Sequence, residues 1–364
     1  MRVSALINLN NIIENYKNIN ALLGEKTEFM AVVKANAYGH GDVQVATALN
    51  NAGCFNFAVA TVDEAIKLRK NNVKGRILIL GPTEPDRLCE VRDYDIVQSV
   101  ASYDHALTAA STAPGIRMHL KIDTGMSRTG IYCHRSEDIN NAVERAAEVY
   151  AVKGINVEGI FTHFAESGNL KSDNTEKQFT MFKSVIDGLT AKGIDVGTRH
   201  CCNSAGTLNY PEYHLDMARV GISLYGLPDG ECRADIKLKP AMTFRSKIVQ
   251  IEELKPGDDV GYSRTYTVKT PIKKAVVSAG YADGFNRLLS NKCEVLINGK
   301  RAKSIGRICM DLSMFDVTGI DCKVGDDVIL FGEDKHVDEF ADIIGTINYE
   351  VVCNVSARVP RIYI

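Results

Sequence analysis

The sequence has no run of 18 or more apolar residues, the length that a membrane-spanning helix needs. Its start, MRVSALINLNNIIENY, shows no apolar segment followed by a small-residue cleavage site, so it does not resemble a signal peptide. Apolar residues make up 45% of the chain and charged residues 24%, a balance typical of a soluble globular protein. We therefore expect a cytoplasmic protein with no membrane partner.

Neither sign of charge is in excess, because the sequence has 43 lysines and arginines and 45 aspartates and glutamates. The basic residues are scattered, so nucleic acid is not an expected partner. The ten cysteines include no CxxC pair and no regular spacing, which favours free thiols in a reducing compartment. No HExxH motif or cluster of histidine and aspartate predicts a metal-dependent enzyme, and we expect no metal.

Short apolar runs alternate with helical patterns over the first two-thirds of the chain, as in a parallel sheet covered by helices on both faces. Eight such runs occur, at 29–33, 56–60, 76–80, 95–99, 116–121, 157–162, 199–202 and 216–220. The clearest helical patterns between them cover 43–53, 62–72, 136–150 and 175–189. Eight strand–helix units close a (β/α)8 barrel of the TIM type, which we predict for residues 1–230. A doubly wound open sheet is the alternative α/β architecture.

The pattern changes after Gly230, where strand signals begin to dominate. We expect strands within 242–254, 273–281, 293–306, 311–317, 326–332 and 353–364, and one short helix at 336–344. Asn298 and Gly299 separate two apolar runs and favour a two-residue hairpin turn of type I′. Residues 231–364 are therefore predicted to form a second, mostly β domain.

Five polar residues lie where predicted barrel strands end, which is the catalytic face of such barrels. They are Lys34, Lys121, His163, Asn203 and Arg219. Each alone would be interpreted as a solvated charge or a core histidine, but their coincidence at one face indicates an active site. Lys34 closes the buried run AVVK, where poor solvation favours a neutral amine that can form a Schiff base with an aldehyde.

The segments after the seventh and eighth predicted strands are rich in small residues. Asn203-Ser204-Ala205-Gly206 and Gly221-Ile222 offer backbone N–H groups at the corner where such barrels often bind phosphate. Together with Lys34, these segments indicate a phosphorylated aldehyde cofactor.

The motif AVVKANAYGHG at 31–41 resembles the cofactor-lysine signature of alanine racemases. Further similar motifs follow in order along the chain: KIDTGMSRTG, FTHFA, CNSAG, ARVGISLYG, VGYSRTY, AGYADG and GRICMD. The resemblance implies a fold type III enzyme that binds pyridoxal 5'-phosphate and has a barrel followed by a β domain. It also implies a head-to-tail homodimer with shared active sites, and a role in supplying D-alanine for peptidoglycan.

Racemisation removes the α-proton from one face of the substrate and returns a proton to the other, so it needs two bases. The resemblance assigns these roles to Lys34 and to Tyr262 of the partner subunit. Cofactor contacts are implied for Lys34, Tyr38, His163, Asn203, Ser204, Arg219, Gly221 and Ile222. Substrate contacts are implied for Arg128, Met310, Asp311 and Tyr281, of which Met310 and Asp311 would come from the partner chain.

Two further charged positions gain a role from the resemblance. Arg219 matches the arginine that faces the pyridine nitrogen, where a permanent donor discourages protonation of the ring and so disfavours transamination. His163 would support Arg219. Lys121 matches a lysine that is often carbamylated in the family, where it orients the arginine at the position of Arg128.

The chain departs from the family pattern at Ala357, where members usually have a tyrosine that touches the phosphate and borders the substrate. The missing ring would leave space for a hydroxymethyl group, and apolar pockets reject an added hydroxyl only weakly. A serine or broad-specificity racemase therefore stays open beside an alanine racemase. A fold type III decarboxylase is disfavoured because its cysteine-containing substrate motif is missing. Short cofactor-binding barrel proteins are disfavoured because they lack a β domain and Tyr262.

Overall fold

The computed structural model describes residues 2–364, which form two compact units. One unit consists of Ile13–Ala37 and Asp42–Leu238. The other consists of residues 2–12, Tyr38–Gly41 and Lys239–Ile364. Within residues 2–364, no helix combines the length and the apolar character that crossing a membrane requires.

The first unit contains a closed ring of eight parallel strands. Their order is β5-β4-β3-β2-β10-β9-β8-β6, and β5 also pairs with β6, which closes the barrel. The strands are β2 (Glu28–Val32), β3 (Asn56–Val59), β4 (Arg76–Ile79), β5 (Val97–Val100), β6 (Ile116–Asp123), β8 (Ile155–Phe161), β9 (Thr198–His200) and β10 (Met217–Val220). Each overlaps one of the eight predicted runs, so the (β/α)8 prediction is confirmed and the open-sheet alternative is wrong.

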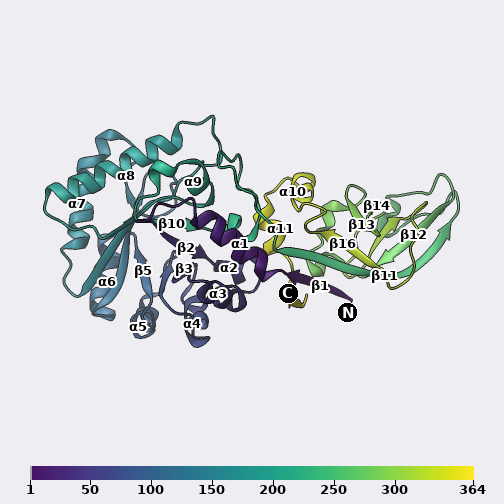
Figure 1. Cartoon of the computed structure of the whole chain (residues 1–364), viewed down its shortest axis with the longest axis horizontal. Helices are drawn as coiled ribbons and strands as arrows, with labels where there is room; N and C mark the ends of the chain where they lie inside the picture. The colour runs from purple at the N-terminus through teal and green to yellow at the C-terminus, as the bar shows by residue number, and fades with distance from the viewer. Residues whose placement is uncertain (1) are drawn as a thin grey trace. The chain divides into compact units, whose positions relative to one another are not determined.

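Helices surround this ring (Figure 1). They are α1 (Leu9–Asn20), α3 (Asp42–Asn51), α4 (Val62–Lys70), α5 (Leu88–Asp93), α6 (Tyr103–Thr112), α7 (Ile139–Tyr150), α8 (Asn174–Ala191) and α9 (Ser204–Asn209). In α7, the residues that face the strands repeat at helical spacing, as in Ala142, Ala146 and Val149, so one stripe of the helix is buried. Helix α4 begins with a capping box in which Thr61 and Glu64 satisfy each other's backbone N–H groups.

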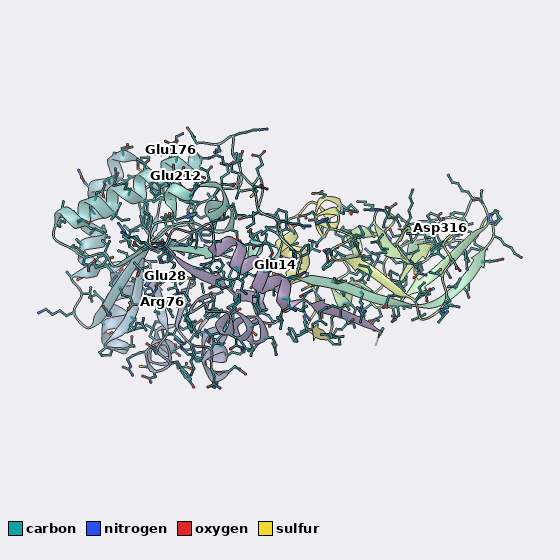
Figure 2. All side chains as sticks on the ribbon, in the orientation of Figure 1. Glu14, Glu28, Arg76, Glu176, Glu212 and Asp316 are labelled. Atoms are coloured by element: carbon teal, nitrogen blue, oxygen red, sulfur yellow. The ribbon has the colours of Figure 1, made fainter. Side chains whose placement is uncertain are left out.

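Ion pairs join the amino-terminal ends of the barrel strands. Arg76 on β4 contacts Glu28 on β2 at 3.2 Å, and Figure 2 labels both residues. Arg117 on β6 holds Glu158 on β8 through two hydrogen bonds of 2.9 and 2.8 Å. These paired charges therefore join neighbouring strands at this end of the barrel.

The second unit is built on one sheet of eight strands. The order is β12-β15-β14-β13-β16-β11-β1-β17, and β11 also pairs with β12. The strands are β1 (Val3–Ile7), β11 (Met242–Leu254), β12 (Ile272–Val277), β13 (Glu294–Ile297), β14 (Lys300–Ser304), β15 (Ser313–Asp316), β16 (Asp327–Phe331) and β17 (Arg361–Tyr363). Asn298 and Gly299 join β13 to β14 with φ values of 49° and 75°, so the predicted hairpin turn is confirmed.

The amino-terminal strand was not predicted. β1 pairs antiparallel with β11 and parallel with β17, so it extends the second sheet, whereas the predicted boundary placed residues 1–230 in the barrel. Local pattern cannot assign a five-residue apolar run to a sheet formed more than 200 residues later. The strand expected over 353–364 was also wrong for most of its length, because only Arg361–Tyr363 is extended. The expected helix at 336–344 is present as α10 (Asp338–Ile344), and a second helix, α11 (Asn348–Cys353), was not predicted.

Candidate active site

Lys34 follows β2 at the carboxyl end of the barrel and opens a left-handed turn. Ala35, Asn36 and Ala37 have φ values of 53–55°, a conformation that costs energy for residues with a Cβ. The turn is held from outside, because the Glu64 carboxylate accepts the Ala35 N–H at 2.6 Å and the Asn36 side chain accepts the Asp42 N–H at 3.2 Å. The backbone beside Lys34 is therefore fixed in a strained shape by its neighbours, as is common at functional sites.

Arg219 on β10 is buried beneath this face. Its Nη1 donates to Nδ1 of His200 at 2.8 Å, and its Nη2 donates to the backbone oxygen of Thr162 at 2.8 Å and that of Cys201 at 3.1 Å. His163 Nδ1 lies 3.3 Å from the same Nη2. Burial lowers the pKa of Arg219 to about 10, which leaves the guanidinium charged at neutral pH.

His163 lies among several cations. Burial lowers its pKa well below the usual value, and the charges of Arg219, Arg128, Lys121 and Lys34 lower it further. These four cations and His163 are therefore within electrostatic reach of one another. The structure brings together all the predicted basic residues of the barrel face, and His163 is a neutral imidazole among them.

Lys121 on β6 is almost fully buried, and its ammonium donates to the Thr129 hydroxyl at 2.7 Å. Burial lowers its pKa to about 8, with smaller contributions from the charges of Arg128 and Arg219. Its ammonium lies 5.8 Å from the centre of the Phe161 ring, and the Arg219 guanidinium lies 5.4 Å from the same ring. Phe161 is thus a common aromatic platform for two buried cations.

The loop that carries Arg128 is organised by Asp123. The Asp123 carboxylate accepts backbone N–H groups from Gly125, Ser127 and Arg128 at 3.0–3.1 Å, and it lies 3.2 Å from His134 Nε2. Burial alone would raise the pKa of Asp123, but these donors hold it below its usual value. The exposed Arg128 side chain therefore projects from a loop with a fixed backbone.

The predicted phosphate corner is built from buried hydroxyl and backbone N–H groups. Asn203 precedes α9, and its side chain accepts the Gly206 N–H at 2.9 Å. The Ser204 hydroxyl accepts N–H groups from Gly221 at 2.9 Å and from Ser223 at 3.4 Å. Ile222 and Ser223 are buried, and among the described residues the Ser223 hydroxyl has no hydrogen-bond partner. These N–H groups are already paired with Asn203 and Ser204, so an oxyanion at this corner would find its donors in the Ser204 and Ser223 hydroxyls.

Five predicted site residues belong to the other compact unit: Tyr38, Tyr262, Tyr281, Met310 and Asp311. The Tyr281 N–H donates to Cys309 and the Ala282 N–H donates to Met310, so the motifs AGYADG and GRICMD lie together. A side chain at Gly306 would meet the Val260 carbonyl oxygen at 2.5 Å, so VGYSRTY packs against GRICMD as well. Tyr262 is 70% exposed, Met310 53% and Tyr281 42%. Tyr38 is buried and contacts the Tyr349 ring at 5.8 Å.

Sequence reasoning missed several residues that shape the site, among them Glu64, His119, Phe161 and His200. One signal was present, because His119 stands two residues before Lys121 in a strand and so shares its face. A histidine between apolar neighbours on a strand that ends at a predicted catalytic residue was a candidate for the same site.

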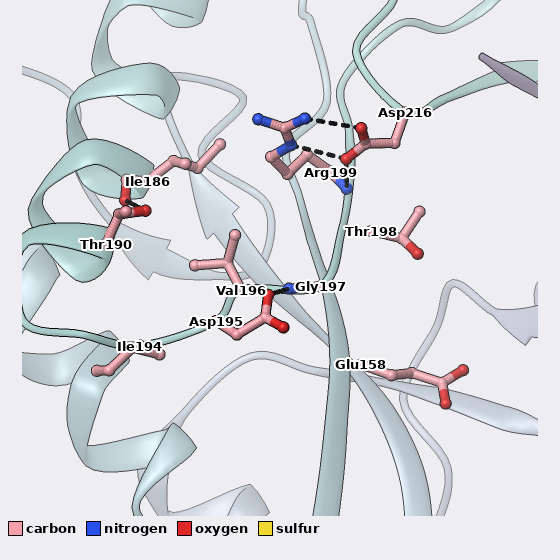
Figure 3. A pocket seen from close by; sticks show the side chains of 10 residues that line it. All are labelled: Glu158, Ile186, Thr190, Ile194, Asp195, Val196, Gly197, Thr198, Arg199 and Asp216. Carbon is pink, nitrogen blue, oxygen red and sulfur yellow. Dashed lines mark hydrogen bonds and ion pairs between the residues drawn. The ribbon is translucent and has the colours of Figure 1, made fainter. Parts of the chain in front are cut away.

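A separate hollow of about 570 Å³ lies at the opposite end of the barrel (Figure 3). Several of its lining residues precede or begin strands, as in Asp195, Thr198 and Asp216, and helix α8 contributes Ile186 and Thr190. Arg199 and Asp216 satisfy each other there through two contacts of 2.7 Å, and the Asp195 carboxylate accepts the Gly197 N–H. Since barrel enzymes place their chemistry at the carboxyl ends of strands, the Lys34 face is the candidate active site.

Comparison with known proteins agrees with this geometry. The chain matches the family "Alanine racemase, N-terminal domain" over residues 7–229 and "Alanine racemase, C-terminal domain" over residues 241–363. It is 44% identical to an alanine racemase of Desulforamulus reducens, over 99% of this chain and 98% of that protein.

Solved structures give the same result. The alanine racemase of Clostridium difficile 630 superposes with a TM-score of 0.94 at 38% identity, covering 100% of this chain and 96% of that one. The alanine racemase of Bacillus anthracis with bound L-Ala-P superposes with a TM-score of 0.90 at 34% identity, covering 100% and 95%. This chain therefore belongs to the alanine racemase family.

Proposed function

We propose that this protein interconverts L- and D-alanine with pyridoxal 5'-phosphate held by Lys34. The observation that carries the proposal is the grouping of Lys34, Lys121, Arg128, His163 and Arg219 at one end of a closed barrel. In a chain of this family, that grouping supplies a lysine for an aldehyde, a buried cation and a basic site for a carboxylate.

The residues present fit the cofactor. The phosphate would be held at Ser204, Gly221 and Ile222, where the Ser204 hydroxyl keeps its own proton to donate and the Ser223 hydroxyl is buried without a partner among the described residues. Asn203 and Tyr38 would complete the cofactor contacts, as the family resemblance implies. When bound, the cofactor supplies an electron sink for the charge that remains after the α-proton leaves.

The residues of the chain would then divide the proton transfers between two faces. Lys34 would serve one face of the substrate, and Tyr262 of the partner subunit would serve the other. The homodimer is part of the proposal, and it is supported by the large exposed side chains of Tyr262, Tyr281 and Met310 on the second unit. Met310, Asp311 and Tyr281 would line the substrate pocket.

Arg128 would receive the substrate carboxylate, and Lys121 would orient it after carbamylation. With its pKa lowered to about 8, the Lys121 amine is neutral in about one molecule in ten at pH 7, and only the neutral amine can react with carbon dioxide. The neutral amine can form a bond from nitrogen to the carbon of carbon dioxide and release a proton. The product is an anion, so it would attract Arg128 where the ammonium now repels it.

A serine or broad-specificity racemase is the second candidate, favoured by Ala357. This residue precedes Arg358, whose guanidinium contacts Asp311, a proposed substrate residue, at 2.7 Å. The proposed cellular role is to supply D-alanine for peptidoglycan, and the proposed location of the protein is the cytoplasm.

The test is formation of D-enantiomer by the purified protein with pyridoxal 5'-phosphate, comparing L-alanine with L-serine. Lys34→Ala should abolish turnover, while Lys17→Ala on the exposed face of α1 should not change it. Faster turnover of serine would assign the second candidate, and Ala357→Tyr should then restore a preference for alanine. Carbon dioxide release from basic amino acids without racemisation would overturn both.

A further inference from the structure

A chain of buried hydrogen bonds runs from Arg219 into the barrel interior. Arg219 Nη1 lies 2.8 Å from His200 Nδ1, and His200 Nε2 lies 2.8 Å from His119 Nδ1. Both histidines are fully buried, and their rings meet edge to face at 5.0 Å between centroids. The His200 ring also stacks on Phe161 at 4.9 Å, which fixes its plane.

The direction of each bond follows from chemistry. A guanidinium has only donors, so His200 Nδ1 must be the acceptor and a neutral His200 must carry its proton on Nε2. That Nε2–H can donate only if His119 Nδ1 is unprotonated, which places the His119 proton on its own Nε2. One permanent cation therefore sets the tautomer of two histidines in series.

His119 has a site shaped for its ring. A Cβ on Gly159 of the adjacent strand β8 would lie 2.7–2.8 Å from three atoms of the imidazole, so only glycine leaves room there. His119 Nε2 lacks a hydrogen-bond partner among the described residues and lies 3.9 Å from the Glu158 carboxylate. That anion, held by Arg117, favours the proton on Nε2, which is the tautomer that the chain requires.

Stability does not explain this arrangement. Two imidazoles beside a charged guanidinium need a full set of partners to be tolerated in a core, whereas apolar side chains of similar volume need none. The described contacts of the chain instead converge on one group at the proposed active site, the Arg219 guanidinium.

We propose that His119 is a positioning residue for the reaction: it keeps His200 in the tautomer that accepts from Arg219, and so holds the Arg219 guanidinium in place toward the ring of the bound cofactor. The inference rests on the proposed racemase function. His119 acts through His200 and touches neither substrate nor cofactor.

The test compares three variants. His119→Asn offers an amide oxygen near the position of Nδ1 and should accept from His200, whereas His119→Leu removes the acceptor. Gly159→Ala keeps the imidazole but displaces it. Matched controls are His105→Leu, another histidine with an unpartnered ring nitrogen, and Gly24→Ala, where a Cβ would meet nothing within 4 Å.

Two readouts separate positioning from structural support. The first is the ratio of 2-oxo acid release to racemisation with alanine. Loss of one buried hydrogen bond should raise this ratio by about tenfold in His119→Leu and Gly159→Ala, with His119→Asn within about twofold of the parent. The second is nitrogen NMR of protein labelled at its histidines, where the His200 Nε2–H signal should change in His119→Leu and persist in His119→Asn.

The outcomes are distinct. An unchanged ratio and an unchanged His200 signal in His119→Leu would overturn the inference. If His119→Leu does not fold, Gly159→Ala serves as the test. A ratio of 2-oxo acid release to racemisation that stays at the parent value in Gly159→Ala, although the His119 ring is displaced, would also overturn the inference. If the parent does not racemise at all, the proposed function fails, while the NMR comparison still tests the hydrogen-bond chain.

Discussion

Replacing His119 should change how stability depends on pH. Burial, together with the charges of Arg76, Arg117 and Arg219, lowers the pKa of His119 to about 3 in the folded protein. In the unfolded chain the same imidazole titrates near pH ~6.5. Below that pH the unfolded state therefore binds a proton that the folded state refuses, and acid favours unfolding.

The magnitude follows from these two values. Above pH ~6.5 His119 is neutral in both the folded and the unfolded state, so its titration does not affect the free energy of unfolding. Between pH ~6.5 and about pH 3, each fall of one pH unit lowers the free energy of unfolding by about 1.4 kcal/mol. Between pH 7 and pH 5 the loss that His119 causes amounts to about 2 kcal/mol. His119→Asn has no such group, so its stability relative to the parent should rise by about 2 kcal/mol over that interval.

The assay is urea unfolding followed by circular dichroism, with parent and variant at the same cofactor concentration and at several pH values. Taking the difference between the two proteins cancels the titration of groups that do not depend on His119, such as His163, whose pKa is also well below normal. A difference that stays constant from pH 7 to pH 5 would refute the reasoning, because it would mean that His119 titrates alike in both states.

Three further predictions concern the barrel face. Arg219→Glu should raise the ratio of 2-oxo acid release to racemisation at least about tenfold, whereas Arg219→Lys should raise it less; equal ratios in all three proteins would count against the role of the charge. Lys121→Met should raise the KM for alanine about tenfold, and removal of bicarbonate should raise the KM of the parent but not that of the variant. A parent KM that does not change when bicarbonate is removed would exclude carbamylation. Glu64→Ala removes acceptors of the Ala35 and Ala60 N–H groups and should lower the free energy of unfolding by about 1–2 kcal/mol, with exposed Asp63→Ala as the control that does not.

The barrel could be predicted because each of its strands carries its own signal. The run 29–33 and residues 77–79 of the run 76–80 are buried and apolar without interruption. The order of the eight strands along the chain is also their order around the ring. The second unit was harder to predict. β1 finds its partners at β11 and β17, and no local feature of residues 3–7 indicates strands that lie so far along the chain.

The site was predictable where a residue ends a strand, and less so where a residue acts inside one. Lys34, His163 and Asn203 follow barrel strands, so counting strands was enough to place them. His119 and Glu64 contribute through contacts with residues on other elements, which neither motif nor periodicity reports. The left-handed turn after Lys34 is a further case, because Ala35 and Ala37, which flank Asn36, have no intrinsic preference for that conformation.

The hydrogen-bond chain in the barrel interior also explains how the orientation of the Arg219 guanidinium is fixed. The two backbone oxygens of Thr162 and Cys201 accept from Nη2 only, so without His200 the Nη1 group would have no acceptor among these contacts. His200 fixes Nη1, His119 fixes His200, and Gly159 fixes the place of His119, so the orientation of one cation depends on three strands of the barrel. The residue type alone makes this group a permanent cation, whereas the packing of the core sets the direction in which it points. Substitutions at Gly159 should therefore alter the balance between racemisation and transamination although that residue lies in the barrel interior.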